Sequence, residues 1–463
     1  MNTLLWFQRD LRLNDNPALS WALQQGKPVI AVYIYSPEED AIWTEGGASR
    51  WWLHQSLKTL SDDLLKLDIK LQFFKANSVE TISQLVTHAQ VSDVVWTNRH
   101  EPYRIQYENE IETELLKKGI EVKRINEGLI SRPDDFLTAS KNTPYRVFTP
   151  FYKKLRNELN LCSFHTHKNR HLKSPGLPAQ RINNALTLEQ LNLLDHHPWH
   201  EKLHSHWAPG EQSASETLDT FIDESLFNYT SERDIPEIEG TSRLSPHLHF
   251  GEISVQQIIT QLTPLIEIQG GCISLQAEAY LRQLVWREFA RYTLWHFPET
   301  STQSMNPKFT KTFWKSNKVN LKKWQQGDTG IPIIDAGMKQ LWESGTMHNR
   351  VRMLVASLLT KNMGIAWQQG AHWFWDTLVD ADLANNTMGW QWVAGCGVDA
   401  APYYRIFNPD TQAKKFDKQG HYINRWLDKP STMKPAKAVV DLATSRVNAL
   451  ERYNNIIRQS KLN

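Results

Sequence analysis

The feature that most constrains the fold is a change of periodicity along the chain. In the first third, short apolar runs alternate with longer amphipathic segments. The apolar runs, which predict buried strands, are LLWFQ (4–8), PVIAVYIY (28–35), KLQFFKA (70–76), DVVWTN (93–98) and VKRIN (122–126). Helical patterns occupy 16–26, 49–67, 78–90 and 105–119 between them. This alternation predicts an α/β domain with a doubly wound parallel sheet.

The strand patterns disappear in the second half of the sequence. From Ala214 onward only helical periodicity remains, at 215–226, 255–268, 274–297, 331–344 and 349–370. Neither pattern dominates from about Ser131 to Gly210, and that composition suits a long connector wrapped on a surface. We therefore expect three parts: an α/β domain at 1–130, a connector at 131–210 and an all-helical domain at 211–463.

Composition narrows the classes of protein that the chain can belong to. The net charge of +2 excludes a protein coated in basic charge, so a nucleic-acid site would be a local patch. The sequence has no apolar run long enough to cross a bilayer and no signal peptide at its start. Three cysteines (Cys162, Cys272 and Cys396) without metal spacing fit a reducing cytosol. The histidines at 195–207 match no closed zinc site.

Tryptophan is unusually frequent, with 19 residues against 17 Phe and 13 Tyr. Large cores and exposed amphipathic rings would explain this number. Stacking on a ring cofactor or a base, or electron transfer through indoles, would explain it equally. Trp390 and Trp392 lie two residues apart, beside Asn385, Asn386 and the acidic Asp382.

Three further segments combine groups that could bind a ligand. Residues 240–254 place hydroxyls and Arg243 just before a helical run, as a pyrophosphate site or an ordinary helix cap would. Gln283, Trp286 and Arg287 share one helical face. Residues 347–353 carry two arginines whose natural partners are the acidic residues near 380, and His348 there is more easily read as a structural histidine than as a catalyst.

Together these segments resemble the photolyase/cryptochrome family. The motifs that carry the resemblance are GTSRLSP (240–246), WREF (286–289), MHNRVRM (347–353) and DADLANNTMGWQWVAGCGVDAAPYYRIFNP (380–409), with WFQRDLRLNDNPAL (6–19), SRWWLHQSL (49–57) and YRVFTPFYK (145–153). The likeness covers nearly the whole chain. It is closest to bacterial cyclobutane pyrimidine dimer photolyases, on the branch nearest plant cryptochromes.

The resemblance implies an N-terminal antenna domain and a C-terminal helical domain that holds FAD in a bent conformation. It implies the following cofactor contacts: Tyr229, Thr241, Ser242, Arg243, Leu244, Ser245, Asn349, Arg352, Asp380, Asp382 and Asn386. Among these, Arg352 and Asp380 match an ion pair over the isoalloxazine. Asn386 matches the side chain facing flavin N5, and Asp382 a partner of the flavin edge.

The resemblance also implies an electron chain and a DNA surface. The chain runs from Trp390 through Trp367 to Trp314, whereas Trp392 matches a substrate contact together with Trp286 and Met353. By position and charge, four arginines are expected to contact UV-damaged DNA: Arg233, Arg287, Arg350 and Arg405. The implied reaction is light-driven splitting of the dimer by reduced FAD, in a cytoplasmic monomer that does not contact a membrane.

The sequence departs from the family in four places. Gln283 replaces the usual Glu and is typical of (6-4) photolyases, but Asn349 and Met353 stand where those enzymes have histidines. Thr346 replaces a Trp, and the stretch after RWLDK (425–429) is shortened. The antenna positions near 98–108 do not reproduce the enterobacterial folate type. Methenyltetrahydrofolate is the first expectation, with an 8-hydroxy-deazaflavin or no antenna as alternatives.

Three functions fit this resemblance. The first is a repair enzyme, and the second is a cryptochrome-type blue-light receptor without repair. The third is a flavin electron-transfer protein, against which the lack of a second cofactor motif argues. Trp286, Met353, Trp392 and the arginines favour the enzyme, because a sensor need not keep a lesion cavity.

Overall fold

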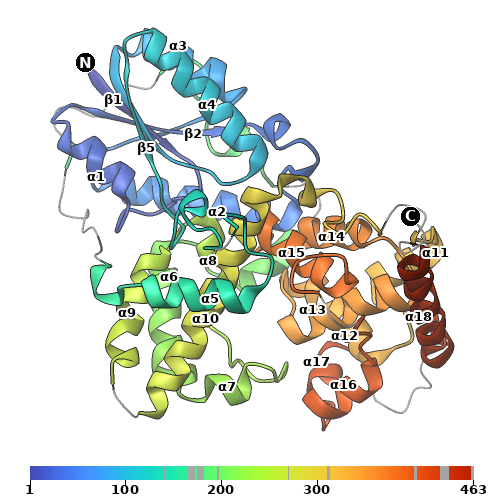
Figure 1. The fold of residues 1–463 in the computed structure, drawn as a ribbon. Helices are drawn as coiled ribbons and strands as arrows, with labels where there is room; N and C mark the ends of the chain where they lie inside the picture. Colours follow the sequence, from blue (N-terminus) through green and yellow to red (C-terminus); the bar gives the residue numbers. More distant parts are fainter. Residues whose placement is uncertain are drawn as a thin grey trace. The chain divides into compact units, whose positions relative to one another are not determined.

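The computed structural model describes residues 1–139, 141–164, 166, 173–174, 182–194, 198–268, 271–309, 313–400, 404–427 and 437–459. By packing, the chain divides into two compact units (Figure 1). The first unit comprises Met1–Asp135, Leu155–Glu224 and Ser242–Glu288, and the second comprises Phe136–Lys154, Ser225–Thr241 and Phe289–Asn463. The limits expected at 130 and 210 follow secondary structure, not packing, and stay a prediction.

The first unit contains a five-stranded parallel sheet, as the sequence predicts. Its strands are β1 (Asn2–Phe7), β2 (Val29–Tyr35), β3 (Leu71–Lys75), β4 (Val91–Thr97) and β5 (Glu121–Ile125), in the order β3-β2-β1-β4-β5. The connecting helices are α1 (Pro17–Gln24), α2 (Gly47–Leu65), α3 (Ser78–His88) and α4 (Pro102–Lys117). The order reverses between β1 and β4, which makes the sheet doubly wound.

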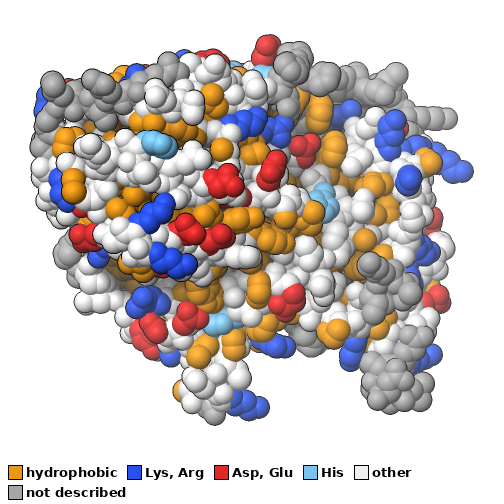
Figure 2. Space-filling model, turned by 90° about the horizontal axis from the view of Figure 1, so that it is seen from above, with side chains coloured by type: hydrophobic (Ala, Val, Ile, Leu, Met, Phe, Trp, Pro, Cys, Tyr) orange, Lys and Arg blue, Asp and Glu red, His pale blue; other side chains and the backbone are white. Residues whose placement is uncertain are grey.

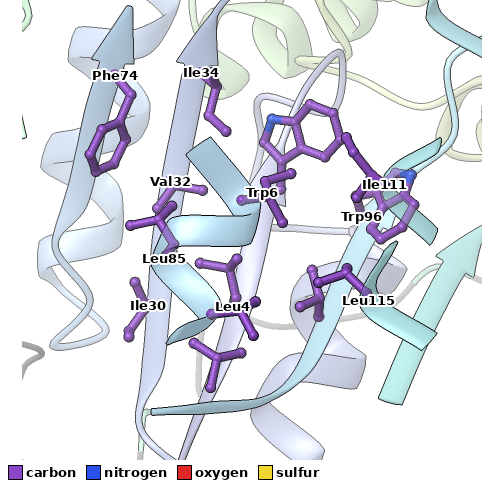
Figure 3. Packing of buried hydrophobic residues seen from close by; sticks show 14 of the residues in the cluster. Leu4, Trp6, Ile30, Val32, Ile34, Phe74, Leu85, Trp96, Ile111 and Leu115 are labelled. Carbon is purple, nitrogen blue, oxygen red and sulfur yellow. The ribbon is translucent and has the colours of Figure 1, made fainter. Parts of the chain in front are cut away.

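The apolar runs of the sequence form the core of this sheet. Leu4, Ile30 and Val94 come from three adjacent strands and are almost fully buried against Leu85 of α3 and Ile111 of α4 (Figure 3). Both faces of a parallel sheet are covered by helices, so β1, β2 and β4 are buried almost throughout and do not alternate, which explains why continuous apolar runs identified them. The edge strand β5 differs: its residues are exposed or half-buried, so the prediction of a buried strand there is wrong.

The rest of the first unit is helical. Its helices are α6 (Glu211–Thr220), which continues as a π-helical turn (Phe221–Ser225), α8 (Ser245–Phe250), α9 (Val255–Ile266) and α10 (Cys272–His296), whose last turns belong to the second unit. Ser254 begins α9 with a capping box to Gln257.

The second unit is also helical. It contains α7 (Tyr229–Glu232), α11 (Lys318–Gln326), α12 (Pro332–Ser344), α13 (Asn349–Ser357), α14 (Trp367–Thr377), α15 (Leu383–Ala394), α16 (Pro409–Phe416), α17 (His421–Trp426) and α18 (Leu442–Gln459). Beyond residue 214, the described part of the chain shows no strand longer than an isolated bridge between Lys315 and Ile365.

The helical periodicity over 349–370 does not correspond to one helix. α13 ends at Ser357, a π-helical turn covers Leu358–Asn362, and α14 begins only at Trp367. Gly364 has a φ of +71°, which a helix cannot continue. The backbone then runs extended through Ile365 beside Lys315, so tertiary pairing overrides a periodic sequence.

The connector is more ordered than its composition suggests. It contains α5 (Phe148–Glu158) and the short 3₁₀ segments Pro133–Asp135, Leu161–Ser163, Glu189–Leu191 and Pro198–Ser205. Phe148, Phe151, Leu191 and Leu203 are buried, so part of this segment belongs to the cores and does not lie on a surface. Residues 175–180 of SPGLPAQ and 428–436 of the shortened C-terminal stretch lie outside the described residues.

On the face drawn in Figure 2, acidic and basic side chains are interspersed with apolar ones, in line with a net charge close to zero. Within the described ranges, no helix combines the length and the apolar character that a bilayer span requires.

Candidate functional site

His348 fixes the start of α13. Its Nδ1 accepts the backbone N–H of Arg350 at 3.2 Å, and its Nε2 faces the carbonyl oxygen of Arg233 at 3.1 Å. One nitrogen accepts, so the other carries the proton and donates. Burial lowers the pKa of His348 to about 4, which keeps the ring neutral. The geometry matches the structural reading of this residue.

Arg352 and Asp380 form the ion pair that the sequence suggested. Nη2 of Arg352 lies 3.1 Å from both carboxylate oxygens of Asp380. Nε of the same guanidinium donates to the carbonyl oxygen of Met347 at 2.7 Å. The hydroxyl of Thr346, one of the departures from the family, accepts from Nη2 at 3.5 Å. Residues of α13, of the turn before it and of the segment before α15 therefore hold this ion pair in place.

Arg350 has a different partner from the one expected. Its guanidinium lies 2.7 Å from Asp234 and 4.3 Å from the ring centre of Phe416. Asp382, proposed as a partner for these arginines, instead lies 3.5 Å from Arg291 of α10. Asp234 follows Arg233 directly, but nothing in the local pattern shows that the segments at 234 and 350 meet.

The start of α15 presents an amide whose orientation is fixed. Asp382 caps the helix by accepting the backbone N–H of Asn385 at 2.9 Å. One turn on, Nδ2 of Asn386 donates to the carbonyl oxygen of Ala371 at 3.0 Å. With the amide nitrogen engaged in this way, Oδ1 of Asn386 is the atom that can accept a hydrogen bond from a ligand.

The three tryptophans of the expected electron chain all lie in the second unit. Trp390 is 3% exposed and packs on Phe374, with ring centres 5.0 Å apart. Its ring occupies the space in which a Cβ at Gly370 would lie, 2.1 Å from one ring carbon. Gly370 is one turn after the fully buried Trp367 on α14. Trp314 precedes Lys315, whose backbone pairs with the segment leading into Trp367.

The residue between the two tryptophans of WQW organises the neighbouring loop. Nε2 of Gln391, which is buried, donates to the carbonyl oxygens of Thr300 and Gln303 at 2.7 and 2.9 Å, and its Oε1 accepts from Met305 at 2.8 Å. Ser304 of this loop accepts the indole N–H of Trp367 at 3.1 Å.

Trp392 lies on a different side of α15 from Trp390. The residue is half-buried, and its indole Nε1 donates to the backbone carbonyl oxygen of Asp399 at 3.2 Å. Successive helical residues are rotated by about 100°, so Trp390 and Trp392 face nearly opposite directions. The spacing of two therefore gives one indole to the interior and one to the surface of α15.

The expected substrate residues of α10 lie in the first unit. Gln283, Trp286 and Arg287 are half-buried on one face. Nη1 of Arg287 donates to the carbonyl oxygen of Gly128 at 3.2 Å and its Nη2 to that of Leu248 at 3.3 Å. These two hydrogen bonds already engage the guanidinium. Its contact with DNA stays a prediction.

The expected phosphate contacts are divided between the two units. Tyr229 is buried, which raises its pKa to about 12, and the Arg233 guanidinium lies 5.1 Å from its ring centre. Arg243 has a φ of 55°, donates to the carbonyl oxygen of His206 at 2.8 Å and covers the ring of Trp207. Its phosphate contact stays a prediction. The other members are Thr241, Ser242, the buried Leu244 and Ser245, the first residue of α8.

Three further predicted residues lie in the second unit at accessible positions. Asn349 and Arg405 are exposed, and Met353 is half-buried on α13. Within the described ranges, no group of histidine, cysteine or acidic side chains could hold a metal ion. His196 and His197 of the histidine-rich tract lie outside those ranges.

Comparison with known proteins decides the family. Residues 3–173 match the DNA photolyase family and residues 280–459 match the FAD binding domain of DNA photolyase. The chain is 39% identical over 431 residues to deoxyribodipyrimidine photo-lyase of Agrobacterium fabrum, covering 92% of this chain and 86% of that protein. This chain belongs to the photolyase/cryptochrome family.

Two other relatives mark the branch of the family. The crystal structure of a bacterial class III photolyase from Agrobacterium tumefaciens superimposes with a TM-score of 0.90 at 35% identity, covering 99% of this chain and 98% of that chain. Cryptochrome-2 of Arabidopsis thaliana is 34% identical over 433 residues, covering 92% of this chain and 70% of that protein. Plant cryptochromes are therefore close relatives of this photolyase-family chain, as the motifs indicated.

The residues of the second unit fit the flavin that the photolyase family carries. Arg352 is neutralised by Asp380, so the pair offers donors without a net charge. Oδ1 of Asn386 is oriented as an acceptor, which suits a protonated ring nitrogen. FAD, when bound and reduced, supplies the electron and the absorption of light. The protein supplies its position and its polar surroundings.

Besides Asp234, two partners of the candidate residues were missed in the sequence. Arg291 lies four residues after Arg287 on α10, so the same helical spacing that grouped Gln283 and Arg287 could have found it. Asp399 lies within the GCGVDAAP motif, but its contact with Trp392 depends on a turn that no spacing rule predicts.

Proposed function

We propose that this photolyase-family protein repairs DNA by splitting cyclobutane pyrimidine dimers with light. The observation that carries the proposal is the division of labour on α15: Trp390 is buried beside Gly370 and Trp392 is half-buried on the opposite side. A light sensor needs the first indole only. The second offers a face on which an extruded base can stack.

The reaction is redox-neutral overall. One electron enters the dimer, the two carbon–carbon bonds joining the pyrimidines break, and the electron leaves again. The buried Trp390 and Trp367 and the half-buried Trp314 renew the reduced state of the cofactor from outside. Trp286, Met353 and Trp392 hold the bases out of the stack, which a damaged pair leaves at a low energetic cost. The Gln283 amide donates to a thymine carbonyl as negative charge develops there.

The substrate is UV-damaged DNA, and Arg233, Arg287, Arg350 and Arg405 are the arginines proposed to meet its phosphates. We propose a cytoplasmic monomer, with methenyltetrahydrofolate as the antenna in the manner of the plant-cryptochrome-like branch. Release of the bound chromophores by denaturation, followed by absorption spectra, identifies the antenna.

The direct test is repair under illumination. Reduced protein is mixed with an oligonucleotide containing one thymine dimer, illuminated with near-UV or blue light, and the restored thymines are counted against a dark control. We expect restoration only in the light. A second oligonucleotide carries a (6-4) photoproduct. Repair of this one alone would make the protein a (6-4) photolyase, and repair of neither would support the cryptochrome reading.

Gln283 is the residue that most directly reports the substrate. Loss of one preorganised donor costs about 2.7–4 kcal/mol in other enzymes, so Gln283→Leu is expected to split far fewer dimers per absorbed photon. Gln283→Glu donates only while protonated, so its repair is expected to fall as pH rises. Equal quantum yields for wild type and Gln283→Leu would show that this side chain does not touch the lesion.

A further inference from the structure

Asp399 links α15 to the segment that leads into α5. We infer that it is a positioning residue that holds the Trp392 indole in place for the lesion. The inference deepens the proposed function and rests on it, because Trp392 is a lesion contact only if the protein repairs dimers. Asp399 itself is not expected to touch the substrate.

The backbone of Asp399 makes the first two links. It adopts a left-handed conformation with a φ of 54°. In this conformation its carbonyl oxygen accepts the indole N–H of Trp392 at 3.2 Å, and its own N–H donates to the carbonyl oxygen of Arg146 at 3.2 Å. The indole is therefore tied, through a single residue, to the segment that leads into α5.

The side chain of Asp399 makes the third link. Its carboxylate accepts the backbone N–H of Phe148, the first residue of α5, although burial raises the pKa of the carboxyl. A carboxylate is favoured at this position because the first N–H groups of a helix lack partners and carry a partial positive charge. Phe148 is 1% exposed, so the anchor is a rigid part of the core.

These links require a particular residue type. A left-handed backbone disfavours most side chains, and Asp, Asn and Gly tolerate it best. Of these three, only Asp and Asn also carry an acceptor oxygen that reaches a helix N-terminus. Asp399 therefore combines the turn that aims the carbonyl at Trp392 with the cap that fixes the turn.

The consequence for the lesion site is preorganisation. Trp390 is held by close packing with Phe374 and α14, whereas Trp392 is half-buried and has less packing to fix its ring. A ring that is already oriented spends less binding free energy on ordering when a base stacks on it. Removing the anchor is expected to weaken binding of damaged DNA without changing the cofactor or its photoreduction.

Three variants of Asp399 separate the two links. Asp399→Ala loses the cap and strains the turn, which weakens the hydrogen bond that orients the Trp392 indole. We expect about three- to tenfold weaker binding of dimer-containing oligonucleotide, the effect of losing one neutral hydrogen bond. Asp399→Gly keeps the turn without the cap and is expected to fall in between. Asp399→Asn keeps both and is expected to restore most of the affinity. Asp68→Ala, at an exposed aspartate of the first unit that is also left-handed, is the control.

A double-mutant cycle tests whether the effect passes through Trp392. We expect the loss caused by Asp399→Ala to disappear in a Trp392→Ala background, because the ring that it positions is gone. Additive losses would show a general effect on the fold and would overturn the inference. Equal affinity of Asp399→Ala and wild type would also overturn it.

A second readout needs no DNA and separates this inference from the proposed function. The indole N–H resonance of Trp392 is identified by its absence in Trp392→Phe, and its exchange with solvent is measured in each variant. Faster exchange in Asp399→Ala, but not in Asp399→Asn, is expected. If the exchange changes in this way but wild type repairs no dimer, the anchor stands and the proposed function fails. Unchanged exchange overturns the anchor alone.

Discussion

The two sides of α15 are built on the same residue type but by different interactions. On one side Trp390 is enclosed by Phe374, Trp324 and the backbone of Gly370. On the other side Trp392 is half-buried and its indole donates one hydrogen bond to Asp399. Packing fixes the first ring and a hydrogen bond orients the second. Under the proposed function, this difference lets one helix serve electron supply and substrate contact separately.

The largest expected effect is on the buried side. Trp390→Phe replaces an oxidisable indole by a phenyl ring of similar shape, so the variant is expected to lose most of the photoreduction of oxidised FAD by an external reductant. The rate is followed by the bleaching of the flavin absorption under blue light. Trp96→Phe, at a fully buried tryptophan of the first unit, is the control. Photoreduction of Trp390→Phe at the wild-type rate would remove Trp390 from the electron chain.

The next effect concerns the half-buried side. Stacking of a base on an aromatic ring contributes about 1–3 kcal/mol, so Trp392→Ala is expected to weaken binding of dimer-containing DNA by about five- to 150-fold. Photoreduction of the cofactor is expected to stay at the wild-type rate. Binding is measured by titration in the dark, with the half-buried Trp199→Ala as control. If Trp392→Ala slows photoreduction instead, the two sides do not have separate roles.

The pH dependence of the free energy of unfolding tests whether a buried, neutral His348 holds the start of α13, in the way that packing holds Trp390. Burial lowers the pKa of His348 to about 4, from about 6.5 in the unfolded chain. The unfolded state therefore takes up the proton first, so the stability is complete above about pH 6.5 and is lost as pH falls towards 4. His348→Asn keeps an acceptor and a donor but does not titrate.

Chemical denaturation of both proteins from pH 7 to pH 4 measures this dependence. The wild type is expected to lose about 2–3 kcal/mol relative to His348→Asn over that range. A constant difference between the two proteins would mean that His348 does not titrate as a buried neutral ring.

The smallest effect compares two arginines that are expected to meet DNA. Arg405 is exposed, whereas Arg350 is paired with Asp234 at 2.7 Å. Arg405→Ala is expected to lower the slope of log affinity against log salt by about one unit, and Arg350→Ala by less, because part of its charge is already neutralised. Titrations at several salt concentrations measure both slopes. An unchanged slope for Arg405→Ala would place that residue outside the phosphate interface.

The fold could be read from the sequence where one local rule decides the structure. Buried parallel strands are apolar on both faces, so runs such as 28–35 predicted the first and last residues of β2 and of its neighbours to within about two residues. The break near Gly364 was missed because the helical period continues through it, and only pairing with Lys315 selects the extended backbone.

The partners of the candidate site residues were predictable only in part. The ion pair between Arg352 and Asp380 follows from the cost of an unpaired buried charge. The same reasoning gave Arg350 the wrong partner, because Asp234 is more than a hundred residues away and charge alone does not choose between carboxylates. The anchor at Asp399 depends on a left-handed turn, which many residue patterns can precede.

We propose that electron supply and dimer splitting are separate functions of the two sides of α15. This separation is tested most directly by the quantum yield of repair in Trp390→Phe protein that has been reduced chemically before illumination without oxygen. We expect a quantum yield of repair equal to that of wild type, although the same variant cannot be photoreduced. A yield that falls together with photoreduction would contradict it, because Trp390 would then take part in the splitting itself.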